Sequence, residues 1–175
     1  MKHFQNIIQK LDRVQQYLEN DALDVIGIEA VNHFKDSFQK EGFTDTSLEK
    51  WKEVKRTDSA SPWYGFKYKS TASRPGQNRK KEGGTTNYSD AATKRPILSG
   101  ETQELLNAFE VRKSSRSVTV FNTKIYAQIH NEGGAMKVFG KLGSKMPKRQ
   151  FMGKSAVLKA KLEKEITRDI LRILK

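Results

Sequence analysis

The chain contains no cysteine among its 175 residues. This absence excludes a disulfide scaffold, a thiol enzyme, a cysteine-ligated zinc module and an iron–sulfur protein. Long apolar runs are missing too, since no stretch approaches the roughly 18 residues that would suggest a membrane span. Charged residues come too early and too often in the first 16 positions for a signal peptide. We therefore expect a soluble intracellular protein with no membrane partner.

Acidic residues are scarce compared with basic ones. Lysine and arginine together number 33 against 20 aspartates and glutamates, which gives a formal net charge of +13. Residues 1–66 hold nine basic and 11 acidic side chains, residues 67–116 hold 11 and five, and residues 136–175 hold 12 and three. The basic middle and C-terminal parts should attract polyanions, either nucleic acid or acidic protein faces, through a field that salt screens. The length predicts a single domain over residues 1–175.

Two helices are predicted at the start of the chain. The first has an apolar stripe at spacings of three and four, formed by Phe4, Ile7, Leu11, Val14 and Leu18. This stripe is too short for a sustained coiled coil, so it should face the core or a partner. The second helix has Asn20 or Asp21 as its N-cap and Gly42 as its stop signal. Because it is apolar around much of its circumference, we expect it to be covered on more than one side.

The next region contains one isolated tryptophan and one long polar segment. Trp51 stands among charged residues, and we predict that it anchors the core against the second helix. Residues 67–95 have almost no aliphatic content and are rich in Gly, Ser, Thr, Asn and basic residues. This composition predicts a flexible basic loop, either an arm that orders on assembly or a tolerated surface insertion.

Regular structure is expected to resume at residue 97. Ser99 is a candidate N-cap for a helix that packs inward through Leu105, Leu106 and Phe109. Alternating side chains predict two short strands, over residues 109–112 and 117–121.

The last third of the chain should hold two more helices. A short helix capped by Asn122 or Thr123 should end at Gly133 and Gly134. A Gly- and Lys-rich connector over residues 136–153 then leads to a terminal amphipathic helix. Its apolar stripe consists of Leu158, Leu162, Ile166, Ile170 and Ile173. The fold class predicted is α+β, with long N-terminal helices and a C-terminal amphipathic helix packed on a small, mainly antiparallel sheet.

The sequence offers little for catalysis. His3 and His33 have no partners at metal-ligand spacing, and the pair His130–Asn131, faintly similar to a nuclease motif, has Glu132 as its only nearby acid. The Gly-rich stretches do not match a phosphate-binding loop. We expect no catalytic residue, no metal and no cofactor, so the protein is not predicted to be an enzyme.

Three motifs between residues 97 and 153 resemble the phage virion morphogenesis family, the tail completion proteins of Mu-like and related tailed phages. They are Ile97–Gly100 before a leucine-bearing helix, Tyr126–His130 running into a glycine pair, and Met146–Gly153. The third is similar to a Pro-x-Arg-x-Phe-Leu-Gly signature, from which the chain departs at Gln150 and Met152. Upstream, the helix ending in Phe38 and the later Trp51 also look like the family's opening pattern.

The resemblance and the residue types together give structural roles to several positions. Pro147 favours extended backbone before it, Phe151 should anchor the core, and Arg149 should reach a carboxylate or backbone carbonyls. His130 is predicted to be a satisfied packing residue. The family-motif positions are Trp51, Ser99, Gly100, Tyr126, Ile129, His130, Gly133, Gly134, Pro147, Arg149, Phe151 and Gly153.

The resemblance implies a non-enzymatic structural protein that completes the tail or joins tail to head at the neck, as an oligomeric ring. Its partners would be other tail, neck or head-completion proteins, and it would be found in the virion and, during assembly, in the bacterial host cytoplasm. Basic residues should face DNA in a channel or acidic partner rims, which the sequence does not rank. They are Arg79, Lys80, Lys81, Lys137, Lys141, Lys145, Lys148 and Lys154. The alternative is a basic nucleic-acid-binding protein, although no DNA-reading motif is present.

Overall fold

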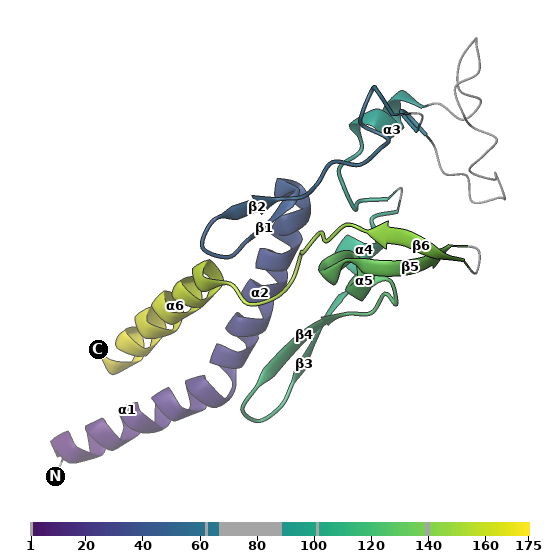
Figure 1. The fold of residues 1–175 in the computed structure, drawn as a ribbon. Helices are drawn as coiled ribbons and strands as arrows, with labels where there is room; N and C mark the ends of the chain where they lie inside the picture. Colours follow the sequence, from purple (N-terminus) through teal and green to yellow (C-terminus); the bar gives the residue numbers. More distant parts are fainter. Residues whose placement is uncertain (1, 62, 67–88, 101, 139–140) are drawn as a thin grey trace.

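The computed structural model describes residues 2–61, 63–66, 89–100, 102–138 and 141–175. Its architecture is α+β, as the sequence predicted, with long N-terminal helices, a C-terminal helix and small antiparallel sheets (Figure 1). None of the helices in the described ranges is long and apolar enough to cross a bilayer.

Helices α1 (Lys2–Glu19) and α2 (Asp21–Lys40) are both present as predicted. Asn20 occupies the N-cap position of α2, but its side chain makes no capping hydrogen bond. The predicted stop at Gly42 is wrong, since Glu41 ends the helix in the left-handed region, with a φ of 48°. Gly42 instead belongs to a strand that approaches its neighbour closely, because a Cβ there would lie 2.5 Å from the Glu49 carbonyl oxygen.

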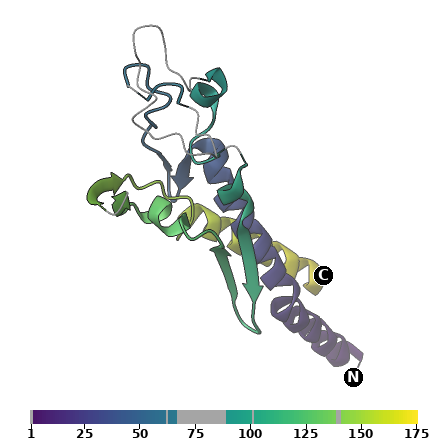
Figure 2. The same cartoon turned by 90° about the vertical axis from the view of Figure 1, so that its right-hand side faces the viewer.

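Helix α2 forms the centre of the molecule. It contacts α1, the C-terminal helix α6 (Ala156–Leu174) and three strands, so the prediction that it is covered on more than one side is confirmed. Its buried face carries the aromatic residues Phe34 and Phe38, around which two apolar clusters form. Figure 2 shows α6 running beside α2, with the β3–β4 hairpin alongside.

The described strands pair into three separate antiparallel hairpins. These are β1 (Gly42–Thr44) with β2 (Leu48–Lys50), β3 (Phe109–Lys113) with β4 (Val118–Asn122), and β5 (Gly134–Val138) with β6 (Lys141–Met146). The β3–β4 pair is the one the alternation predicted. The connector predicted over residues 136–153 is wrong in its first half, where β5 and β6 pair with a register shift at Met136/Lys137. Glycine and lysine are poor strand formers, so this hairpin depends on pairing between the two backbone segments rather than on strand propensity.

Two further expectations need correction. Most of the predicted loop at 67–95 lies outside the described residues, but its end forms helix α3 (Asp90–Lys94), in which Ala92 is fully buried. The helix expected from Ser99 shrinks to α4 (Glu104–Asn107). Ser99 does not cap it, since its hydroxyl donates to the Pro96 carbonyl at 2.7 Å in the preceding turn.

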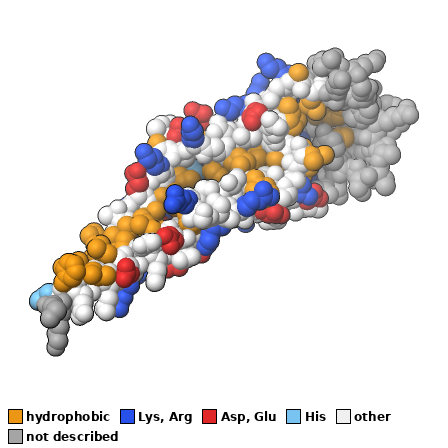
Figure 3. Space-filling view, turned by 90° about the horizontal axis from the view of Figure 1, so that it is seen from below, with side chains coloured by type: hydrophobic (Ala, Val, Ile, Leu, Met, Phe, Trp, Pro, Cys, Tyr) orange, Lys and Arg blue, Asp and Glu red, His pale blue; other side chains and the backbone are white. Residues whose placement is uncertain are grey.

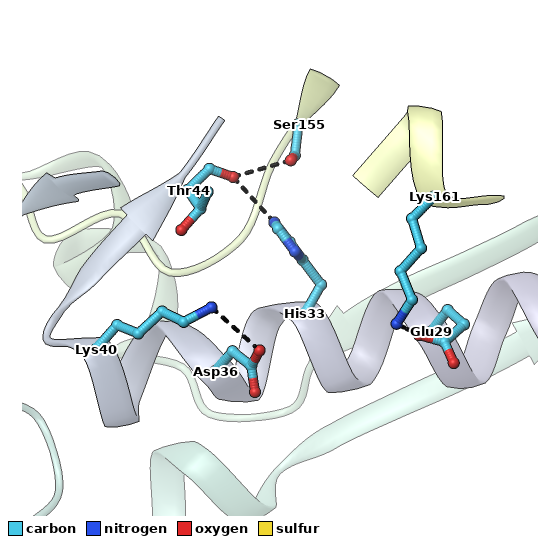
Figure 4. Close-up of polar contacts among 7 residues, drawn as sticks. All are labelled: Glu29, His33, Asp36, Lys40, Thr44, Ser155 and Lys161. Carbon is cyan, nitrogen blue, oxygen red and sulfur yellow. Dashed lines mark hydrogen bonds and ion pairs between the residues drawn. The ribbon is translucent and has the colours of Figure 1, made fainter. Parts of the chain in front are cut away.

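The N-terminus of α6 is fastened to α2 by a polar cluster (Figure 4). The Thr44 carbonyl lies 3.0 Å from His33 Nε2 and accepts a 2.8 Å hydrogen bond from the Ser155 hydroxyl. The same hydroxyl caps α6 by accepting from the Leu158 amide. Burial lowers the pKa of His33 below its ordinary value, so a neutral ring that donates from Nε2 fits this carbonyl. On the adjacent turns Lys161 forms an ion pair with Glu29.

Candidate functional site

Five family-motif residues meet at one junction, which is made of the segment after β2, helix α5 (Ala127–Glu132) and the segment after β6; they are Trp51, His130, Gly133, Arg149 and Phe151. Gly100, Tyr126 and Gly153 are exposed. Arg149, only 6% exposed, donates from Nε and Nη2 to the Lys52 carbonyl at 3.1 Å and from Nη2 to the Glu53 carbonyl at 3.3 Å. Its backbone amide donates to the His130 carbonyl at 2.8 Å. The prediction that Arg149 reaches backbone carbonyls is therefore confirmed, and burial lowers the pKa of its guanidinium.

Phe151 forms the apolar centre of this junction. It has no exposed surface and its ring lies 5.2 Å from that of Phe38 and 5.9 Å from that of Phe109. Trp51 packs edge-on against Phe38 at 5.6 Å, and its indole donates to the Gln150 carbonyl at 2.6 Å. Both residues are core anchors, as the sequence predicted.

Asn131 has a structural role that was not predicted from the sequence. Its Oδ1 accepts from the Phe151 amide at 2.9 Å and from the Met152 amide at 3.0 Å, so one side chain holds the extended segment against α5. The sequence signal was an amide residue in the last turn of a short helix followed by two glycines. Which distant backbone it would bind depends on the tertiary fold.

The glycine pair allows the close approach on which the junction depends. Gly133 has a φ of 72°, and a Cβ there would lie 2.7 Å from the Lys148 backbone nitrogen. Gly134, with a φ of 130°, leads directly into β5 and faces Ile129. Gly153, with a φ of 151°, turns the chain towards α6. These glycines have backbone roles, as expected.

His130 is half-buried and packs edge-on against Tyr126, whose ring lies 5.9 Å away. The predicted packing role fits this geometry, but the prediction of a satisfied ring is wrong. Its Nδ1 is buried and has no hydrogen-bond partner within the described part of the chain. Burial, and then the charge of Arg149, lower the pKa of His130, so the ring is neutral at pH 7. No group of three metal-binding side chains occurs among the described residues.

A cleft of about 1030 Å³ lies over the junction and is rimmed with positive charge. Pro147, Gly100 and the apolar side chains of Trp63 and Leu98 line it. The basic lining residues are Lys52, Lys55, Arg56, Arg95, Lys145, Lys148 and Arg149, against the acids Glu53 and Glu132. The first four were not among the predicted polyanion contacts, although Lys52, Lys55 and Arg56 belong to a basic run at residues 50–56 and Arg95 ends the predicted basic loop.

The predicted polyanion contacts are only partly brought together by the fold. Lys145 and Lys148 line the cleft, whereas Lys154 is exposed outside it. The side chains of Lys137 and Lys141 lie outside the described part of the structure, as do Arg79, Lys80 and Lys81.

A second surface is formed by the apolar stripe of α1. Along this helix Figure 3 shows apolar side chains on the molecular surface, continuing towards the body of the molecule. Of the predicted stripe, Phe4 is 69% exposed, Ile7 56%, Leu11 58% and Leu18 45%, whereas Val14 is half-buried. Ile8, beside the stripe, is 43% exposed. The sequence predicted that this stripe faces either the core or a partner. In the structure most of it lies outside the core.

Comparisons of the chain with family models, with curated proteins and with solved structures found no match.

Proposed function

We propose that this chain is a non-enzymatic structural protein of phage or prophage virion assembly. It completes the tail or joins the tail to the head at the neck, acting as an oligomeric ring beside other tail, neck or head-completion proteins. It would act in the virion and, before that, in the host cytoplasm during assembly.

The observation that carries the proposal is the convergence of the motif residues. The motifs were chosen for their order in the sequence, yet Arg149, Phe151, His130 and Trp51 meet through direct contacts and hydrogen bonds. Residue type alone would bury Trp51 and Phe151, but the hydrogen bonds of Arg149 to the Lys52 and His130 carbonyls join separate motifs. The convergence supports the view that the motif residues specify a scaffold. Motif residues whose contacts are structural fit a structural protein better than an enzyme.

The experiment is imaging of particles from a phage or prophage strain with and without this gene. We expect the deletion to give full heads with separate or aberrant tails, because subunits at a joint are needed only once heads and tails exist. Complementation with the intact gene should restore joined particles. Normal particles from the deletion strain would overturn the assembly role.

A basic nucleic-acid-binding protein is the second candidate, and the basic cleft is the observation that favours it. Seven cationic side chains against two acidic ones give the lining a local excess of positive charge. Of the aromatic rings in the lining, Phe66 is buried, and Trp63 and His130 are each only partly exposed, so little surface is offered for base stacking. The cleft thus favours backbone phosphates over base recognition.

For this candidate we expect a labelled single-stranded oligonucleotide to bind in a salt-sensitive way. The double variant Lys52→Glu with Lys148→Glu should weaken binding by about tenfold or more, because it reverses two charges at the rim. Fluorescence anisotropy at two salt concentrations measures both effects. The control is Lys159→Glu with Lys164→Glu, which changes the net charge equally on exposed positions of α6. Equal loss in both variants would assign binding to the overall charge rather than to the cleft.

A further inference from the structure

We propose that the exposed stripe of α1 is a self-association surface that binds the α1 helix of a second copy of this chain in antiparallel orientation. The proposal rests on the proposed function and adds one contact between subunits, which pairs two copies; closing a ring would use a second, head-to-tail surface. We call the stripe the α1 seam and define it by five residues. They are Phe4, Ile7, Ile8, Leu11 and Leu18.

A different face of α1, which carries Lys10 and Tyr17, packs against α6, so the seam is left exposed. The Tyr17 hydroxyl donates to the buried Asp169 carboxylate of α6 at 3.2 Å, and Lys10 Nζ donates to the Leu174 carbonyl at 2.6 Å. At 100° per residue, Lys10 and Tyr17 lie roughly 100–125° around the helix from the centre of the seam. The helix is therefore held in place by α6 while its most apolar face remains in water.

The area of the seam suits a pair of copies. Taking about 150 Å² for a fully exposed large apolar side chain, the five exposed fractions amount to about 400 Å² of apolar surface on each subunit. A pair would bury about 800 Å² from these side chains alone, and the flanking polar residues would bring the total near the roughly 1,200 Å² of a small specific interface. A patch of about 400 Å² lies within the range of roughly 300–600 Å² that the largest apolar patch of a monomer usually covers, and such patches are often functional.

Three of the five seam residues are symmetric about Leu11, which fits a second copy, whereas Ile7 and Ile8 would lie opposite Gln15 and the half-buried Val14. Phe4 and Leu18 are each seven residues from Leu11, and Ile8 and Val14 are each three residues from it. In an antiparallel pair with a two-fold axis at Leu11, Phe4 of one copy meets Leu18 of the other, and the two Leu11 side chains meet each other. A self-complementary patch is what a two-fold interface requires.

The charge distribution allows two α1 helices to come into contact. Residues 1–40 carry five basic and six acidic side chains, whereas the whole chain has a net charge of +13. Two copies that meet through their N-terminal helices therefore bring together nearly neutral regions, and their strongly basic parts can remain apart. An acidic partner, by contrast, would be attracted to the basic cleft rather than to the seam.

The test is the mass of the full-length protein in solution, measured by size-exclusion chromatography with light scattering over a range of concentrations. We expect the unmodified chain to form a dimer or a larger assembly built from dimers. Leu11→Glu should raise the dissociation constant at least tenfold, because it places two carboxylates against each other at the two-fold axis. The control Ile125→Glu, at a position 98% exposed and outside α1, should leave association unchanged.

Circular dichroism on heating should show that Leu11→Glu still folds, since this side chain is mostly exposed. A monomeric unmodified chain, or undiminished association of Leu11→Glu, would overturn the proposal. The result is separate from the assembly role. Normal particles from the deletion strain would remove the assembly role and leave a measured dimer standing, and a monomer together with defective particles would do the reverse.

Discussion

Phe151→Ala should lower the free energy of unfolding by about 3–5 kcal/mol, which is the usual cost of removing a fully buried phenylalanine. The ring has no exposed surface and contacts Phe38 and Phe109 from different elements. Its loss opens a cavity where α2, β3 and the segment before α6 meet, and packed helix and strand backbones cannot collapse fully into that space. Urea unfolding followed by circular dichroism measures the change.

Two variants make this prediction specific. Phe151→Leu keeps most of the apolar volume and should cost less than about half as much as alanine. Ile125→Ala removes a large apolar side chain that is 98% exposed, and we expect a change within about 0.5 kcal/mol. A loss below about 1 kcal/mol for Phe151→Ala would contradict the role of Phe151 as the core anchor.

Asn131→Ala should cost about 1–3 kcal/mol, because it leaves two partly buried backbone amides without their acceptor. These amides belong to Phe151 and Met152, so the variant also releases the segment that carries the core anchor. Hydrogen exchange of the two amides should accelerate together with the loss of stability.

Asn131→Asp is the informative comparison, since its carboxylate keeps an oxygen acceptor for both amides. We expect it to recover most of the stability that alanine loses. Gln128→Ala is the matched control on the same short helix, because Gln128 is exposed and, among the described residues, its side chain hydrogen-bonds only to Glu132. If aspartate and alanine were equally destabilising, the amide contacts would not be the source of the effect.

The buried junction and the two exposed surfaces should have different roles, in folding and in binding respectively. The junction joins three distant segments with buried side chains, so its variants should act on folding. The α1 seam and the basic cleft are exposed, so their variants should act on association and binding while the fold persists. This separation allows the assembly role and the individual surfaces to be tested independently.

Local pattern was sufficient for much of the fold. The spacing of Phe4 to Leu18 predicted α1, the alternation at Val118 and Val120 predicted β4, and the apolar stripe from Leu158 predicted α6. It failed where backbone geometry depends on distant neighbours. Glu41 rather than Gly42 takes the left-handed conformation, and β5 and β6 pair despite a composition that disfavours strands.

The sequence by itself determined the periodic elements, the core anchors Trp51 and Phe151, and the excess of positive charge, because these follow from residue type and spacing. Only the tertiary structure decided which surfaces remain exposed. It placed Asn131 under the backbone of Phe151, gathered basic residues from separate segments around one cleft, and left the stripe of α1 in water. Each of these depends on contacts between residues far apart in the chain, which no local pattern encodes.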